Sequence, residues 1–133
     1  MRIKEEIVAD VVKEASEKMS DPNYSAVLVG TFVQQQAPTA QYIGAHADEL
    51  GGPEAVVNTI FHASLISECF KRANNRTVGS ISFDQLNIVS DGDRHARLGD
   101  RQPAIVGYLE MNVEEKEMRD ILALVSLAID WVS

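Results

Sequence analysis

The segment from Pro53 to Ala73 constrains the fold more than any other part of the sequence. Two glycines precede Pro53 and Glu54 follows it, a combination that is typical of the first turn of a helix. In the second half of the segment the apolar residues recur at intervals of three and four, at Ala63, Ile66, Cys69, Phe70 and Ala73. In the first half they point to roughly the opposite side, at Val56, Val57, Ile60 and Phe61. An apolar face that changes side midway predicts a buried helix that lies between two sets of neighbours.

The rest of the chain shows the same helical pattern. Apolar residues follow helical spacing over residues 3–19, and after a break at residues 20–22 the chain restarts at a proline. Residues 38–50 and 53–74 are predicted to form a helical hairpin around the two glycines. Residues 90–101 are the most polar segment of the chain, and we expect them to form an exposed loop.

Capping residues mark two further helices. Ser82 is expected to cap a short helix that ends near Val89. Asn112 is expected to cap the last helix, because Glu115 follows it at the capping-box position. A chain of this length forms one domain, residues 1–133, and can bury about two-thirds of its unfolded surface. We therefore predict an all-α domain of five to seven helices around a buried central helix.

The alternative is an α+β fold in which residues 24–33 and 104–111 are strands. Residues 24–33 are rich in β-branched side chains, which favour strands. However, Tyr24, Leu28 and Phe32 lie four residues apart, and three glutamines extend the segment without a hairpin turn. We favour the helix.

Two parts of the chain show a weak internal sequence repeat. The segment from Gln36 to Ile43 lines up with the segment from Gln102 to Leu109, 66 residues later. Two matching helix hairpins related by a pseudo-twofold axis would explain the similarity. Only Gln, Tyr and an aliphatic residue coincide, so chance convergence of two helix starts explains it equally well.

Charge and cysteine content exclude several classes of protein. The formal net charge of −8 disfavours binding to nucleic acid and to anionic membranes. The apolar runs are far too short to span a membrane. Cys69 is the single cysteine, and the first residues are too charged for a signal peptide. We therefore expect a protein of the cytoplasm, with no nucleic-acid or membrane partner.

One set of side chains could hold a metal ion. His46 and Glu49 lie three residues apart, and an antiparallel hairpin would bring His62 near them. Imidazole and carboxylate ligands suit zinc or iron. The motifs that usually carry these ions, HExxH and paired ExxH, do not occur in the sequence. We therefore expect no metal or other cofactor, and regard these three residues as the candidate ligands of a less favoured alternative.

The polar segment carries three arginines, Arg94, Arg97 and Arg101. Aspartates balance their charge, which favours a solvated surface. The alternative is that the three guanidinium groups bind an acidic partner or a phosphate. The segment also resembles the start of a calcium loop, but Ala96 and Gln102 stand where glycine and glutamate are required, so we expect no calcium site.

Nucleophilic and DNA-binding chemistry find little support. His62 and Cys69 lie seven residues apart on one helix, about 10.5 Å along its axis, too far for the histidine to activate the thiol. Cys69 is better interpreted as a small buried apolar residue. A helix-turn-helix is disfavoured because the second helix carries only Lys71 and Arg72, both near its far end.

These observations predict a non-catalytic helical module for protein interaction or regulation, without a cofactor. A homodimer is one form that its interaction could take, since the central and terminal helices are apolar on most sides. The first alternative is a small helical metal-binding protein or enzyme that uses His46, Glu49, Asn58 and His62. The second is a protein that binds a small apolar ligand in a pocket between the hairpins.

Overall fold

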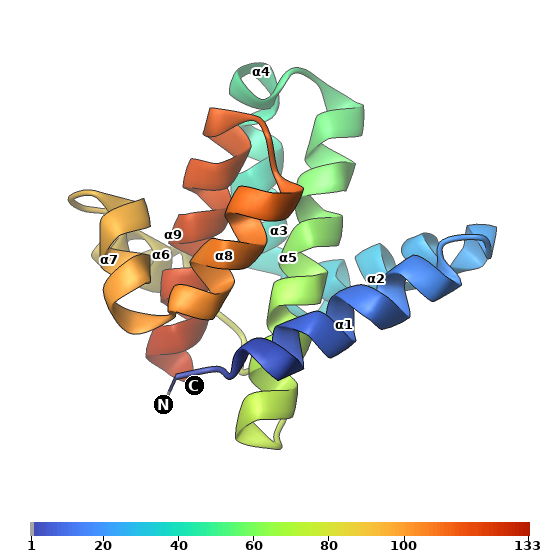
Figure 1. Cartoon of the computed structure of the whole chain (residues 1–133). Helices are drawn as coiled ribbons and strands as arrows, with labels where there is room; N and C mark the ends of the chain where they lie inside the picture. Colours follow the sequence, from blue (N-terminus) through green and yellow to red (C-terminus); the bar gives the residue numbers. More distant parts are fainter. Residues whose placement is uncertain (1) are drawn as a thin grey trace.

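The structure, a computed structural model, describes residues 2–133, and these residues form nine α-helices (Figure 1). The helices are α1 (Glu5–Lys18), α2 (Pro22–Gln35), α3 (Ala37–Ala45), α4 (Ala47–Leu50), α5 (Pro53–Asn74), α6 (Phe83–Val89), α7 (Arg94–Arg101), α8 (Pro103–Asn112) and α9 (Lys116–Val132). The all-α prediction is confirmed. Because residues 24–33 and 104–111 are helical, the α+β alternative is wrong. The helices outnumber the expected five to seven because α3 breaks at His46 before the single turn of α4, and because α7 replaces the expected loop.

Local sequence decides where several helices begin and end. The side chain of Asp21 accepts a hydrogen bond of 2.9 Å from the backbone nitrogen of Asn23, and Pro22 opens α2. Ser82 and Gln85 form a reciprocal capping box at the start of α6. Gly51 ends α4 with φ at +107°, a left-handed conformation that glycine adopts without strain. The predicted helix restart at Pro22, the cap at Ser82 and the turn at the two glycines are confirmed.

Helices α5 and α9 pack against each other at the centre of the molecule. Helix α9 is the more completely buried of the two, since every residue from Ile121 to Asp130 is buried. Helices α1 and α2 pack against α5. Val57, near the start of α5, is about half exposed. The prediction that neighbouring helices bury the first half of this helix is therefore wrong at Val57.

Residues 94–101 form helix α7 rather than the predicted exposed loop. The side chain of Asp93 caps the helix by accepting a 3.1 Å hydrogen bond from the backbone nitrogen of Ala96. Leu98 is fully buried and anchors the helix to the core. The prediction was wrong because this single apolar residue stands among charged neighbours that face solvent.

The connection to the last helix also differs from the prediction. Asn112 is the final residue of α8, where its side-chain nitrogen donates a 3.0 Å hydrogen bond to the carbonyl of Tyr108. The last helix begins at Lys116, after Glu115, whose side chain makes no capping hydrogen bond. Val113 is buried and separates the two helices. The capping-box pattern therefore marked a connection rather than a helix start.

The two halves of the chain repeat one arrangement of helices. The order α1, α2, α3 and α5 in the first half corresponds to α6, α7, α8 and α9 in the second. In each half the fourth helix packs against the first, second and third, and the second also packs against the third. Between the halves α5 packs against α9, α1 against α8, and α3 against α6. These contacts stay the same when the halves are exchanged, which is the mark of a pseudo-twofold axis.

Two buried glutamines lie at equivalent places in the halves. Gln36 joins α2 to α3 and is 2% exposed, and Gln102 joins α7 to α8 and is 1% exposed. The side-chain oxygen of Gln36 accepts a 2.9 Å hydrogen bond from the backbone nitrogen of Ile81, just before α6. That of Gln102 accepts a 2.8 Å hydrogen bond from the backbone nitrogen of Ile3, just before α1. Each half therefore holds the start of the other, and the weak sequence repeat reflects this reciprocal contact.

Candidate functional site

An open groove with a volume of about 530 Å³ lies between α1 and α8. The bond between Gln102 and Ile3 joins the starts of the two helices, which diverge from that point (Figure 1). The groove is lined mainly by apolar and small side chains, namely Val8, Ala9 and Val12 from α1 and Pro103, Ala104, Gly107, Tyr108 and Met111 from α8. Glu5, Lys13 and Asn112 also contribute to the lining.

Two residues on the α8 side of the groove, Gly107 and Met111, leave room for a bound molecule or can adapt to it. A Cβ atom added at Gly107 would meet no atom within 4 Å, so the fold does not require a glycine there. Glycine inside a helix costs about 0.5–1 kcal/mol relative to alanine. Gly30 and Gly44 share this property, but only Gly107 lies in the groove. Met111 is 87% exposed, and its flexible side chain can adapt to a bound apolar surface.

The pseudo-twofold axis provides an internal control for this surface. The starts of α1 and α6 align through matching buried residues, which are Ile3 with Ile81, Val8 with Leu86 and Val11 with Val89. On this alignment, the surface between α3 and α6 corresponds to the groove. The counterparts of Ala9, Val12 and Gly107 are all polar, namely Asn87, Ser90 and Gln41. Phe83 stands at the place of Glu5, so the difference in polarity is confined to the middle of the groove.

The sequence interpretation missed the groove because its walls come from opposite ends of the chain. Ala9 and Gly107 belong to helices that each look like ordinary amphipathic segments. The repeat was the available signal, because aligning the two halves shows where one half is apolar and the other polar. An apolar surface that the fold does not require is typical of a binding site.

Tyr108, which lines the groove, is hydrogen-bonded to His62 of α5. A hydrogen bond of 2.7 Å joins Nδ1 of His62 and Oη of Tyr108, and the two rings meet edge to face. Burial lowers the pKa of His62, although the charge of Glu115 opposes this shift. Burial also raises the pKa of the Tyr108 hydroxyl. Both groups are therefore neutral near pH 7, and the bond fixes the tyrosine ring that lines the groove.

The structure does not bring the candidate metal ligands together. His46 donates a 2.8 Å hydrogen bond from Nδ1 to the carbonyl of Tyr42, and its ring lies 4.5 Å from the ring of that residue. His62 is bound instead to Tyr108. Within residues 2–133, no three histidine, cysteine, aspartate or glutamate side chains are placed to hold a metal ion. The trio of His46, Glu49 and His62 thus forms no common site.

The three candidate arginines hold α7 in place. Arg94 forms an ion pair of 3.0 Å with Asp120, and Arg101 forms one with Asp130. Arg97 donates to the carbonyl oxygens of Val89, at the end of α6, and of Asp91, in the connection that follows it. Because Asp120 and Asp130 are ten residues apart on α9, about 15 Å along its axis, Arg94 and Arg101 do not converge on one anion. Their role in binding an acidic partner or a phosphate stays a prediction.

Cys69 is buried in α5, as expected for a small apolar residue. Burial raises the pKa of its thiol to about 12. The thiolate, which is the reactive form, is therefore almost absent at neutral pH. The Cys69 thiol is therefore poorly suited to act as a nucleophile.

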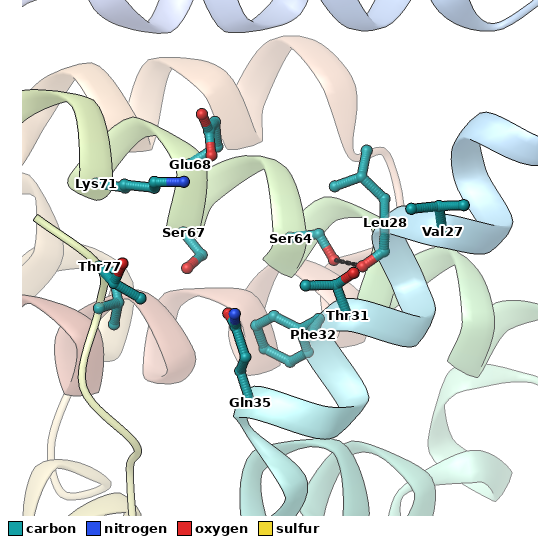
Figure 2. Close-up of a pocket in the computed structure, with 11 residues that line it drawn as sticks. Val27, Leu28, Thr31, Phe32, Gln35, Ser64, Ser67, Glu68, Lys71 and Thr77 are labelled. Carbon is teal, nitrogen blue, oxygen red and sulfur yellow. Dashed lines mark hydrogen bonds between the residues drawn. The ribbon is translucent and has the colours of Figure 1, made fainter.

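A second hollow, of about 210 Å³, lies between α2 and α5 (Figure 2). Two of its polar side chains, Ser64 and Glu68, form hydrogen bonds within the protein. The hydroxyl of Ser64 donates to the carbonyl of Ile60 at 2.8 Å and lies 3.4 Å from that of Leu28. Glu68 accepts a hydrogen bond of 3.1 Å from Arg72. The wall that α2 contributes carries no charged side chain.

The comparisons give this geometry no precedent. No helix within residues 2–133 is both long and apolar enough to cross a membrane. Comparison of the chain with protein-family models, with curated proteins and with solved structures finds no match. The function must therefore be argued from the groove itself.

Proposed function

We propose that this chain is a non-catalytic interaction module that binds an apolar segment of a partner protein in the groove between α1 and α8. One observation carries the proposal: the middle of the groove carries Ala9, Val12 and Gly107, where the pseudo-twofold counterpart carries the polar residues Asn87, Ser90 and Gln41. The fold therefore accommodates polar residues at these three equivalent positions, although α6 is shorter than α1 and ends one residue before Ser90. The apolar residues of the groove are therefore best explained by a contact outside the chain.

The shape of the groove suits a short amphipathic helix. The stretch of α1 from Glu5 to Lys13 is about 12 Å long, which matches about two turns of a partner helix. Gly107, Ala104 and Ala9 leave room for large apolar side chains or for close approach of a backbone. Helices commonly bind in this way, with apolar residues spaced three and four apart lying in the groove.

The net charge and the single cysteine support the rest of the proposal. A net charge of −8 disfavours nucleic acid as the partner, so a protein is the better candidate. The buried Cys69 can form no disulfide within the chain, which suits a reducing compartment such as the cytoplasm. No cofactor is needed for this function.

A small apolar ligand is the second candidate, and the volume of the groove favours it. Ligand sites commonly have volumes of about 300–1,000 Å³, and that of the groove falls within this range. Polar groups at Glu5, Lys13 and Asn112 could orient such a ligand. The openness of the groove along α1 and α8 favours a peptide instead.

The test blocks the groove and compares the result with a matched control. Gly107→Arg places a long charged side chain in the groove, whereas Gln41→Arg places the same side chain at the pseudo-twofold equivalent position. Tagged wild type and both variants are cross-linked in cells of the native host, and the partners are identified by mass spectrometry. We expect a partner that binds wild type and Gln41→Arg but not Gly107→Arg. Equal recovery with all three proteins would refute a groove-bound partner.

Native mass spectrometry of the same proteins distinguishes the second candidate. A small molecule retained by wild type and Gln41→Arg, and lost from Gly107→Arg, would support a ligand site. Circular dichroism and thermal unfolding of the three proteins serve as the control for folding, because both positions tolerate a side chain directed into open space.

A further inference from the structure

Helix α2 is a surface helix without a charged side chain. Its fourteen residues include no Asp, Glu, Lys or Arg, although charged residues make up 24% of the chain. A surface segment of this length and average composition would contain about three. Only Phe32 of α2 is buried, so the absence of charge is not explained by burial. Depletion of charge on a surface is typical of the centre of a protein interface.

The exposed side of α2 carries a continuous stripe of small and apolar residues. They recur at intervals of three and four at Ala26, Val27, Gly30 and Val33. Val27 is 66% exposed, and a Cβ atom added at Gly30 would meet no atom within 4 Å. Small residues one turn apart, such as Ala26 and Gly30, allow the axis of another helix to approach closely.

The pseudo-twofold counterpart of α2 shows that the fold does not require this composition. Helix α7 occupies the equivalent place and packs against α9 as α2 packs against α5. It carries four charged residues other than histidine among its eight, namely Arg94, Arg97, Asp100 and Arg101. The uncharged surface is thus specific to α2.

We propose that α2 packs against α2 of a second copy of this chain, forming a twofold homodimer. In a twofold contact the same surface serves both copies, so residues next to the axis face their own counterparts and a charge there would lie opposite an identical charge. Two copies, each with a net charge of −8, repel one another over most of their surfaces. Helix α2 offers a long apolar surface where that repulsion is absent and small residues permit close packing.

The size of the contact indicates a weak dimer. A helix of fourteen residues is about 21 Å long, so a single helix pair falls at the low end of protein interface sizes. We therefore expect a dimer that dissociates on dilution through the micromolar range. The α2 surface shares no lining residue with the groove between α1 and α8, so this inference is independent of the proposed function.

The experiment introduces charge at Val27, the more exposed of the two valines in the stripe. Wild type, Val27→Glu and Val27→Lys are studied by sedimentation velocity over a range of concentrations. Ile88→Glu is the matched control, because Ile88 lies on α6 and is 63% exposed, nearly the same fraction as Val27. Thermal unfolding checks that each variant keeps the stability of the wild type.

We expect wild type and Ile88→Glu to dimerise equally, and each Val27 variant to raise the dissociation constant at least about tenfold by placing like charges together. An equimolar mixture of Val27→Glu and Val27→Lys should recover dimers, because opposite charges then face each other across the axis. A wild type that stays monomeric at high micromolar concentration overturns the proposal. Loss of dimers without recovery in the mixture also overturns it, since α2 would then contact some other surface.

Discussion

Replacing the buried glutamines tests whether the reciprocal bonds between the halves hold the fold together. Methionine has nearly the same length and shape as glutamine but makes no comparable hydrogen bond, so Gln36→Met removes the bonds without opening a cavity. The change leaves the backbone nitrogen of Ile81, which is fully buried, without its acceptor. It also removes the 2.7 Å bond that the Gln36 amide donates to the carbonyl of Gly79.

The magnitude follows from the surroundings of these two groups. A buried donor left without a partner costs about 1–3 kcal/mol. The carbonyl of the exposed Gly79 can bind water instead, so the loss of its hydrogen bond to Gln36 costs only about 1 kcal/mol. We therefore expect Gln36→Met to lower the free energy of unfolding by about 2–4 kcal/mol, out of about 5–15 kcal/mol for a typical domain. Gln102→Met should have a similar effect, because it removes the bonds to Ile3 and to Asp130.

Urea unfolding measures both variants, with Gln41→Met as a control for the same substitution at an exposed position. The midpoint should fall for the buried glutamines while the slope with denaturant stays constant. The corresponding drop in melting temperature is about 7–14 °C for a chain of this length. If Gln36→Met cost no more than the control, the bonds between the halves would not contribute to stability and the reasoning would be wrong.

Three further substitutions or measurements test other parts of the structure. The hydroxyl of Thr39 is buried without a hydrogen-bond partner within residues 2–133, and Ile105 occupies the equivalent place in the other half. Thr39→Val should therefore raise the free energy of unfolding by about 1–2 kcal/mol, measured by urea unfolding. Burial lowers the pKa of His62 from its ordinary value of 6.5, so the folded state favours the neutral ring. The contribution of His62 to the free energy of unfolding should therefore be fully present above pH 6.5 and should be lost on acidification. His62→Gln should reduce this loss of stability as the pH falls below about 6.5, and an unchanged dependence on pH would contradict the assigned cause. Cys69 should resist a thiol reagent in the native protein and react at once in denaturant, because its thiol is buried and its pKa is about 12.

Much of the helical architecture could be predicted from the sequence because local residues determine it. The restart at Pro22 and the cap at Ser82 depend on neighbouring residues, and both were predicted correctly. Helix α7 was missed because the apolar content of its sequence rests on one buried leucine. A pattern with a single apolar residue does not differ from that of a charged loop.

The candidate site was less predictable because it depends on contacts between distant segments. The groove requires that the start of α1 lies beside the start of α8, and Gln102 achieves this by binding Ile3. The sequence contained the glutamine but no local sign of its acceptor. The charge-free composition of α2 was visible in the sequence, but its exposure was not.

The two halves together separate what the fold requires from what it does not. Positions that match, such as Gln36 and Gln102, support the shared architecture, whereas the groove differs from its counterpart. Transferring the counterpart residues with Ala9→Asn, Val12→Ser and Gly107→Gln should therefore change stability by no more than about 1 kcal/mol, because the helix preference gained at position 107 offsets losses at the other two. The same variant should lose the partner of the groove. A large loss of stability in urea unfolding would instead show that the apolar residues of the groove serve the fold, and the case for a binding site there would fail.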